Sequence, residues 1–397
     1  MLKKRCLHRI AVACVALLVA VCSSSALADA TAQSALTRLF TSKQIEADWF
    51  ADSFLQQVPA SQVQTIVGQL VAQLGAFKSV KPEGAKYRVN FEHGDDLASI
   101  VLDPSGRITG LFFEAPLRYA ANFQSAFDAF KQLPGDVSVY IADNGARRAA
   151  LAADTQLAVG STFKLAVLAA VQQAVATHAT SWNAVVRLDA RQKSLPSGVL
   201  QTWPDGALLT VYSYAALMIS QSDNTAADVL LDLAGRSAVE RYGPRNRPFL
   251  TTREAFVLKD PRNASLLKHY RASDTAQRRQ LLSQIDLLPL PDASIFAGAP
   301  QDTDIEWFFT TRELCALMAG VQRLPLMSIN PGVAEPADWT RVAYKGGSEP
   351  GVLNLTTWVV SKNRHSYCVS ATWNDDKPVD ELEFFGLYKS LLSTLKS

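Results

Sequence analysis

The sequence predicts a mixed α/β protein of the α+β type, in which a small domain precedes a larger one. The chain of 397 residues is long for one domain and comfortable for two. Its 48% apolar and 19% charged residues are typical of a globular protein with ample material for a core. Near the N-terminus, a block with helical periodicity precedes a block with strand periodicity, which indicates a small α+β unit.

The first residues have the three-part layout of a secretory signal. Basic residues at 3–5 precede an apolar run at 10–21, and small residues then end in Ala-Leu-Ala at 26–28. The apolar run is shorter than the roughly 20 residues that a membrane-spanning helix needs. A lipoprotein site at Cys22 is disfavoured by the bulky residue before it. We therefore expect residues 1–28 to be removed, leaving a periplasmic or secreted protein with no stable membrane span.

The first domain is assigned to residues 29–118. Apolar residues recur at near-helical spacing over residues 34–74, where Pro59 separates two helices. Residues 77–113 alternate between apolar and polar side chains, and turn signals interrupt them, which predicts about three antiparallel strands. One of these turn signals contains polar residues that we expect to be solvated, namely His93, Asp95 and Asp96.

The second domain is assigned to residues 119–397. A helical pattern lies near residues 118–132. Two strands follow at 137–141 and 149–153, joined by the strong hairpin signal Asn144-Gly145. Further helices and strands follow, and the chain ends with a helix over residues 382–395.

A Ser-x-x-Lys motif at residues 161–164 opens an apolar run that indicates a buried central helix. Ser161 then lies at the helix N-terminus, where free N–H groups and the helix dipole favour developing negative charge. Lys164 lies one turn further along the same face, and a desolvated lysine can take a proton from serine. The same spacing at 265–268 and 393–396 lacks partner motifs, so we interpret both as chance.

Two further motifs accompany it. Ser222-Asp223-Asn224 lies between helical segments, where its hydroxyl can relay a proton and its amide can hold an acylamide group; a helix N-cap is the alternative. Lys345-Gly346-Gly347-Ser348 lies between two strand patterns, and its glycines let a ligand approach the backbone. Lys345 offers positive charge for a substrate carboxylate; the alternative is a surface lysine in a strand–turn–strand unit.

These three motifs, in this order, resemble the signature of class A β-lactamases and penicillin-binding proteins. The resemblance covers residues 122–397 and implies an antiparallel sheet flanked by helices, with an all-helical subdomain. It implies that Ser161 is the acylated nucleophile, with Lys164 as general base and Ser222 as proton relay. The N–H groups of Ser161 and Ser348 would form the oxyanion hole. The substrate-binding residues implied in the same way are Asn224, Lys345, Gly347 and Ser348.

The sequence departs from this family pattern in two places. Gly346 stands where the family usually has a hydroxyl residue. The family's Glu-x-x-x-Asn motif, whose glutamate activates the deacylating water, has no match, and a long charged stretch fills residues 235–304 instead. Glu306 is the candidate for that base, with Asp302 and Asp304 beside it. The simpler expectation for each of these carboxylates is a solvated loop residue.

Two phrases, at residues 195–201 and 248–254, together with the extra N-terminal domain resemble one branch of this superfamily. It comprises two-domain β-lactamase-like hydrolases, including a protein associated with clavulanic-acid biosynthesis. In that branch the small domain is similar to cystatin-like or isomerase-like folds. The resemblance implies esterase-like or weak β-lactamase activity.

The composition limits the partners and cofactors. With 39 basic and 37 acidic residues, the chain offers no electrostatic footprint for nucleic acid or an anionic membrane. No CxxC, HExxH or histidine cluster occurs, so we expect no metal and no cofactor. Cys315 and Cys368 are the cysteines of the mature protein; they either pair in an oxidising compartment or are buried apolar residues.

The sequence therefore predicts a secreted, monomeric serine hydrolase whose substrate is a small-molecule β-lactam. One alternative is an esterase or peptidase that uses the same mechanism on another acyl compound. The other is a penicillin-binding or sensing protein that deacylates slowly.

Overall fold

The computed structural model describes residues 32–396. The expected signal peptide at residues 1–28 lies outside the described residues. The chain divides into two compact units. The first ends at Ala120 and also includes Leu382–Ser390, whereas the second comprises Ala121–Glu381 and Leu391–Ser397. Most of the C-terminal helix α13 (Glu381–Ser393), which we expected in the second domain, thus groups with the first unit.

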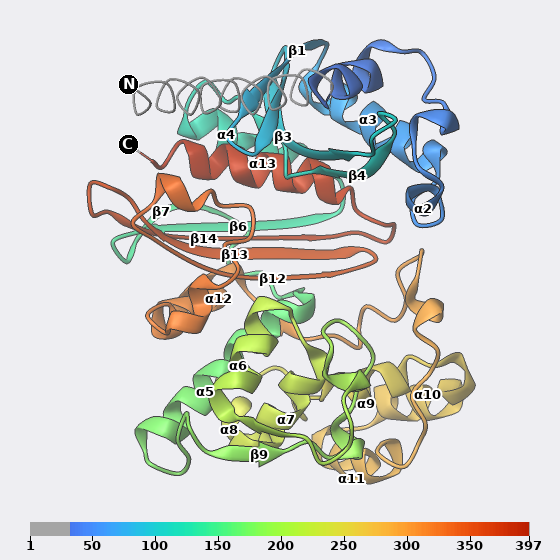
Figure 1. Cartoon of the computed structure of the whole chain (residues 1–397). Coiled ribbons are helices and arrows are strands. Elements are labelled where there is room, and N and C mark those ends of the chain that lie inside the picture. The colour runs from blue at the N-terminus through green and yellow to red at the C-terminus, as the bar shows by residue number, and fades with distance from the viewer. Residues whose placement is uncertain (1–31, 397) are drawn as a thin grey trace, which may run out of the picture. The chain divides into compact units, whose positions relative to one another are not determined.

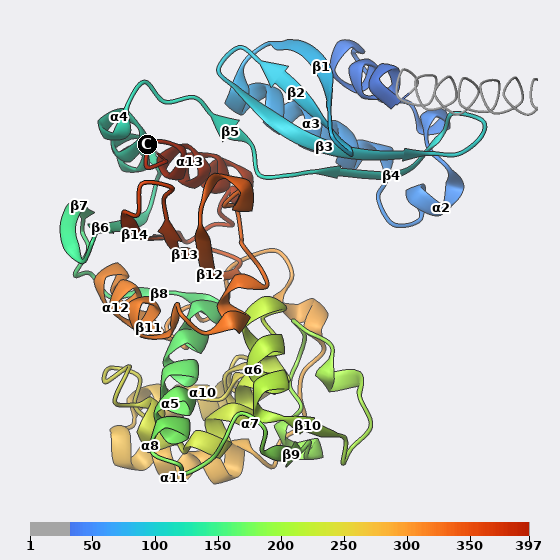
Figure 2. The ribbon, with the colours of Figure 1, turned by 60° about the vertical axis from the view of Figure 1, so that its left-hand side comes forward.

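The first unit packs helices against an antiparallel sheet (Figure 2). A helix at 32–41 and two short turns of helix, η1 (Ala47–Trp49) and α2 (Asp52–Leu55), precede the main helix α3 (Ala60–Leu74). The strands follow in the order β1-β2-β3-β4, and β5 pairs with β3. Their bounds are β1 Phe77–Glu83, β2 Lys86–Phe91, β3 Gly94–Leu102, β4 Ile108–Phe113 and β5 Leu117–Arg118. The core combines the buried face of α3 with the strand residues Val80, Val89, Ala98 and Ile108.

Two expectations for this unit were wrong. The first helix does not run on to Phe54, because the chain turns through η1 and α2. The expected turn around Asp95 is the start of strand β3, and Asp96 is 0% exposed, with burial raising its pKa to about 8. The reason lies at Gly94, where a Cβ atom would lie 2.2 Å from the carbonyl oxygen of Leu117. This glycine serves the close pairing of β5 with β3, not a turn.

The second unit is built on a five-stranded antiparallel sheet in the order β12-β13-β14-β6-β7. Its strands are β12 Arg341–Glu349, β13 Val352–Val360, β14 Ser366–Asn374, β6 Asp136–Asp143 and β7 Ala146–Leu151. The predicted hairpin at Asn144-Gly145 is confirmed, with φ values of 49° and 83° that suit a tight β-turn. The expected helix near 118–132 begins only at α4 (Phe123–Ala129).

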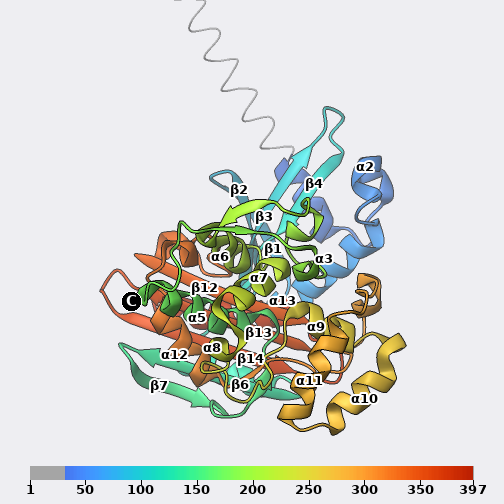
Figure 3. The same cartoon turned by 90° about the horizontal axis from the view of Figure 1, so that it is seen from below.

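Most helices of this unit gather on one side of the sheet (Figures 1 and 3). They are α5 Lys164–Ala176, α6 Val211–Ser220, α7 Asn224–Ala234, α8 Arg236–Val239, α9 Thr252–Leu258, α10 Ala264–Ala272, α11 Thr275–Ile285 and α12 Thr311–Val321. Two small sheets pair β9 (Val185–Arg187) with β10 (Leu208–Thr210), and β8 (Leu157–Ala158) with β11 (Phe308–Phe309). The predicted architecture of a helix-flanked antiparallel sheet with a helical subdomain is confirmed. Among residues 32–396 no helix is long and apolar enough to cross a membrane.

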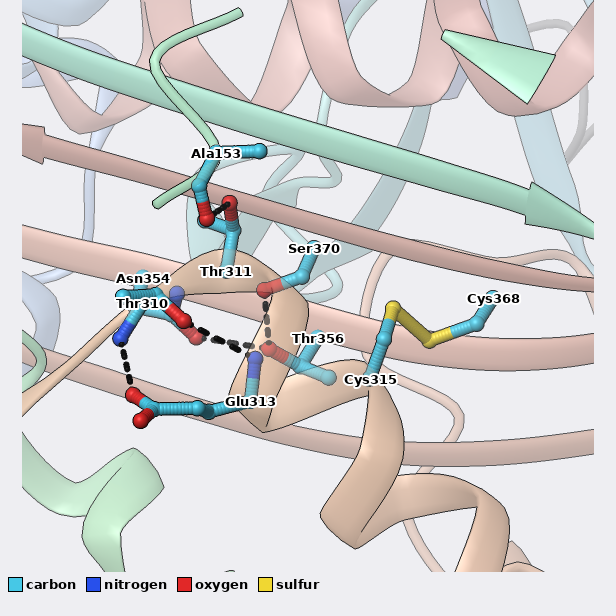
Figure 4. Close-up of a disulfide and its surroundings, with 9 residues drawn as sticks. All are labelled: Ala153, Thr310, Thr311, Glu313, Cys315, Asn354, Thr356, Cys368 and Ser370. Atoms are coloured by element: carbon cyan, nitrogen blue, oxygen red, sulfur yellow. Dashed lines mark hydrogen bonds between the residues drawn. A yellow bond between two sulfur atoms is a disulfide. The ribbon is translucent and has the colours of Figure 1, made fainter. Parts of the chain in front are cut away.

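A disulfide joins Cys315 on α12 to Cys368 on β14 (Figure 4). The sequence left this pairing open. Beside the disulfide, Thr356 bridges the side chains of Asn354 and Ser370 across the sheet, at 2.9 and 2.8 Å. The covalent bond ties α12 to strand β14, and the buried polar chain links β13 to β14.

We expect the double variant Cys315→Ala/Cys368→Ala to unfold at a lower temperature than the wild type. The disulfide links positions 53 residues apart, and closing a loop of this order stabilises a fold by about 2–4 kcal/mol. Circular dichroism should record a Tm lower by about 5–15 °C. Dithiothreitol should lower the Tm of the wild type and leave that of the double variant unchanged. Equal Tm values for both proteins in oxidising buffer would contradict the prediction.

Candidate active site

Ser161 lies in a short helical turn, η3 (Gly160–Phe163), which leads directly into α5. The side chain of Ser161 is half-buried, and its Oγ accepts a hydrogen bond of 2.9 Å from Nζ of Lys164. The side chain of Phe163 stacks on Trp307 with ring centroids 3.9 Å apart, which anchors the turn in the core. The expected position of the serine at the start of a buried helix is therefore confirmed.

The ammonium group of Lys164 is fully buried among polar partners. Besides Ser161, it donates to the carbonyl oxygen of Ser222 at 2.6 Å, to the hydroxyl of Ser222 at 3.2 Å and to Oδ1 of Asn224 at 2.6 Å. Burial lowers the pKa of Lys164 to about 7, against the opposing effect of nearby carboxylates. Near neutral pH a large fraction of this amine is therefore unprotonated and can accept the proton of Ser161.

Ser222 occupies the loop between α6 and α7 in a left-handed conformation, with φ of 56°. Its hydroxyl lies between two amines, 3.2 Å from Nζ of Lys164 and 3.0 Å from Nζ of Lys345. The next residue, Asp223, caps α7 by accepting from N–H of Ala226, and also accepts from the N–H groups of Val199 and Leu200. The motif therefore both caps helix α7, through Asp223, and places the hydroxyl of Ser222 between the two lysines.

Asn224 begins α7 and is held from both ends of its amide. Oδ1 accepts from Lys164, and Nδ2 donates to the carbonyl oxygen of Leu195 at 3.0 Å. These contacts fix the orientation of the amide beside Ser161.

Lys345 extends from β12 toward the same point. Its Nζ donates to Oγ of Ser222 and to the carbonyl oxygen of Gly346. Burial, and then the charge of Lys164, hold the pKa of Lys345 well below its ordinary value. The structure therefore brings Ser161, Lys164, Ser222 and Lys345 together in one hydrogen-bonded group. The alternative of a surface lysine is wrong, because Lys345 is buried.

Gly347 lets strand β12 lie against the loop that carries Ser161. A Cβ atom at this position would lie 2.3 Å from the carbonyl oxygen of Val159 and 2.5 Å from the N atom of Ser161. A Cβ atom on Gly160 would likewise come within 3.2 Å of the N atom of Ser348. The backbones of Ser161 and Ser348 thus approach each other closely, as a pair of oxyanion donors requires.

We expect Gly347→Ala to disturb the site and the fold. The new methyl group meets backbone atoms that cannot move aside, so stability should fall by about 1–3 kcal/mol in urea titrations. Acylation should slow by about a hundredfold if one oxyanion donor is displaced. The control is Gly320→Ala on α12, where a Cβ atom meets nothing within 4 Å; it should be neutral or stabilising by up to about 1 kcal/mol. Equal behaviour of the two variants would contradict this account.

Tyr344 explains why the triad has glycine at its middle position. A Cβ atom on Gly346 would lie 2.1 Å from the hydroxyl oxygen of Tyr344, whose ring packs over Gly332. The hydroxyl of Tyr344 therefore occupies the space beside Gly346 that a side chain there would fill. Tyr344 was not expected in the site, although residues two apart in a strand share a face, which is a usable signal.

The three acidic candidates upstream of β11 lie in different environments. Asp302 and Asp304 pair with Arg271 near the surface, as expected of loop residues. The side chain of Glu306 is only 1% exposed and pairs with the buried Lys259, so the expectation of a solvated residue is wrong for Glu306. Lys259 also contacts Glu349 on β12, at 3.0 Å. Neither Lys259 nor Glu349 was expected in a site, because no motif links them.

The residues described offer no metal centre, since no group of three or more His, Cys, Asp or Glu among them could hold an ion. The second Ser-x-x-Lys spacing, at 265–268, lies on α10 with both of its end residues exposed.

Comparisons with known proteins agree with the motifs. Residues 120–281 match the family model described as "Beta-lactamase enzyme family". No curated protein matches the chain. Solved structures similar to it include PBP-A (16% identity, TM-score 0.49, covering 70% of this chain and 97% of that one). A β-lactamase from Sphaerobacter thermophilus is 22% identical with a TM-score of 0.46, over 69% of this chain and 95% of that one. A β-lactamase from Xanthomonas campestris is 16% identical with a TM-score of 0.48, over 69% and 96%.

The matched segment contains Ser161, Lys164 and Ser222, and the sheet strand that carries Lys345 completes the group. Residues 120–281 of the second unit, which include Ser161, Lys164 and Ser222, are therefore similar to the β-lactamase enzyme family.

Proposed function

We propose that this protein is a secreted serine hydrolase that is acylated at Ser161 and hydrolyses the amide of a β-lactam. The observation that carries the proposal is the contact between Oγ of Ser161 and the buried amine of Lys164, at 2.9 Å. An amine with a pKa near 7 is matched to proton abstraction at neutral pH. No substrate-free structural role calls for a buried lysine beside a half-buried serine.

Acylation follows from the positions of these groups. Lys164 takes the proton of Ser161, and Oγ attacks the lactam carbonyl carbon. The N–H groups of Ser161 and Ser348 hold the oxyanion. As the C–N bond breaks, the lactam nitrogen takes a proton from the hydroxyl of Ser222, which regains one from Lys164; the hydrogen bonds of Ser222 to both lysines suit this transfer. The amine of Lys164 is then neutral again.

Substrate binding would use the groups around this centre. Lys345 gains a counter-charge when the substrate carboxylate arrives, which offsets its burial. The hydroxyl of Tyr344 adds the contact that Gly346 lacks. Asn224 retains one amide hydrogen for the acylamide carbonyl, since only one is used by Leu195.

Export to the periplasm or the medium is part of this proposal. The sequence pattern of residues 1–28 suggests it. The disulfide between Cys315 and Cys368 supports it, because disulfides persist in oxidising compartments.

The test is intact-protein mass spectrometry of the mature protein with benzylpenicillin and a cephalosporin, run as a time course beside a chromogenic cephalosporin assay. Mass gain by one acyl group with steady turnover would support a β-lactamase. A persistent adduct without turnover would favour a penicillin-binding or sensing protein. Neither adduct nor turnover would refute the β-lactam substrate and leave an esterase or peptidase acting on another acyl compound.

A further inference from the structure

A second group of charged side chains lies beside the acylation site and has no role in the steps above. It consists of Lys259, Glu306 and Glu349. The side chains of Lys259 and Glu306 are 2% and 1% exposed, whereas that of Glu349 is 26% exposed. Nζ of Lys259 donates to Oε1 of Glu306 and, at 3.0 Å, to Oε2 of Glu349. One lysine thus neutralises only one of two adjacent carboxyl groups.

The carboxyl groups of Glu306 and Glu349 differ in the direction of their pKa shifts. Oε2 of Glu306 is buried and has no hydrogen-bond partner among the described residues. Burial, and then the charge of Glu349, raise the pKa of Glu306 well above its usual value. Burial alone would raise the pKa of Glu349 too, but Lys259, Glu306 and Lys164 together lower it. The pKa of Glu306 is thus raised and that of Glu349 lowered, so Glu349 is the more readily ionised of the two.

The strand geometry directs Glu349 toward the nucleophile. Successive side chains on a strand alternate, so Lys345, Gly347 and Glu349 share one face of β12. On that face Lys345 contacts Ser222, and Gly347 lies directly against the N atom of Ser161. Glu349 follows about 7 Å further along the strand. Its charge is close enough to Lys164 for each group to shift the pKa of the other.

Two other carboxylates influence Lys164, but neither can reach water. Asp223 is 0% exposed and accepts from three main-chain N–H groups. Asp228 is also buried, and accepts from N and Oγ1 of Thr252 and from N of Arg253. Of these three described carboxylates near Lys164, Glu349 alone is partly exposed.

We propose that Glu349 is the general base that activates the deacylating water, and that Glu306 and Lys259 position it and keep it ionised. The inference rests on the proposed acylation of Ser161. Glu349 takes one proton from water while the water oxygen bonds to the acyl carbon, and the oxyanion forms at the N–H groups of Ser161 and Ser348. The bond from the acyl carbon to Oγ then breaks. Oγ receives the proton that Glu349 held, which leaves a carboxylic acid and the free serine.

The deciding experiment compares acylation and deacylation in Glu349→Gln and the wild type. Benzylpenicillin, a cephalosporin and p-nitrophenyl acetate serve as acylating probes, and intact mass gives both rates. Glutamine keeps the shape but cannot accept the proton, so deacylation should slow by about 10²–10⁴-fold. Acylation should stay within about threefold of the wild type, because its base is Lys164. Formation of the adduct itself shows that the variant site is folded.

The matched control is Glu335→Gln, the same change at an exposed glutamate. Acylation and deacylation in this variant should match those of the wild type. Lys259→Met removes the cation and should move the acid limb of the deacylation rate to higher pH, a readout that a purely structural role would not shift. If the acid limb of the deacylation rate lies at the same pH in Lys259→Met as in the wild type, the positioning role is contradicted.

The outcomes separate this inference from the function on which it rests. An acylated Glu349→Gln that deacylates as fast as the wild type would overturn the role of Glu349 and leave acylation at Ser161 intact. An accumulating adduct in Glu349→Gln with turnover in the wild type is the expected result. A wild-type protein that no probe acylates would refute the proposed function, and the role of Glu349 with it.

Discussion

Ser161→Ala is expected to eliminate the covalent adduct and reduce hydrolysis by about 10⁴–10⁶-fold. The alanine side chain has no atom that can attack a carbonyl carbon, and no other hydroxyl is bonded to the buried amine except that of Ser222. Any remaining rate would come from the oxyanion donors and from substrate binding. Intact mass after incubation with benzylpenicillin measures the adduct, and a chromogenic cephalosporin measures turnover.

The chain supplies its own control for this variant. Ser265 begins a second Ser-x-x-Lys spacing on α10, where both Ser265 and Lys268 are exposed. Lys268 lacks the buried polar surroundings of Lys164, so it is not expected to activate a serine. Ser265→Ala should therefore acylate and turn over as the wild type does. An adduct on Ser161→Ala, mapped by proteolysis to any other residue, would contradict the assignment.

The nucleophile and its base could be predicted from local geometry. Ser161 and Lys164 are one helical turn apart, so the helix alone brings their side chains together. The turn at Asn144-Gly145 was predictable for the same reason, because a few residues determine it. The contact of Lys345 with Ser222 spans 123 positions of the chain, and no local rule predicts it. It was expected only because the three motifs resemble a known family.

Other parts of the site could not be read from the sequence. The ion pair of Lys259 with Glu306 spans 47 positions, and that with Glu349 spans 90. Each of these residues alone looks like a solvated charge, and only the fold shows that Lys259 and Glu306 are buried and that Lys259 pairs with both glutamates. Gly94 shows the opposite error. It was interpreted as a turn glycine, whereas the close pairing of two strands requires it.

The rate of acylation is expected to depend on pH through Lys164. Only the neutral amine can accept the proton of Ser161, and the pKa of Lys164 is lowered to about 7 by burial. Protonation below this value removes the base, so the second-order rate of adduct formation should fall about tenfold per pH unit below roughly pH 6. The rate should be nearly constant above roughly pH 8. Intact-mass time courses across this range measure it.

Two lysine variants test which group produces the acid limb of this pH profile of the acylation rate. Lys164→Arg keeps a positive charge but has no neutral form, so acylation should slow by about 10²–10⁴-fold and lose its acid limb. Lys345→Ala removes the cation for the substrate carboxylate, so KM should rise, and loss of the neighbouring charge should move the acid limb to higher pH without abolishing it. An acid limb that persists unchanged in Lys164→Arg would show that another group takes the proton of Ser161.

Lys164 and Lys345 are both buried and share the hydroxyl of Ser222. A substrate carboxylate that stabilises the charge on Lys345 therefore also favours the neutral form of Lys164. Substrates without that carboxylate should therefore be acylated more slowly even at saturation, which links recognition at Lys345 to the basicity of Lys164.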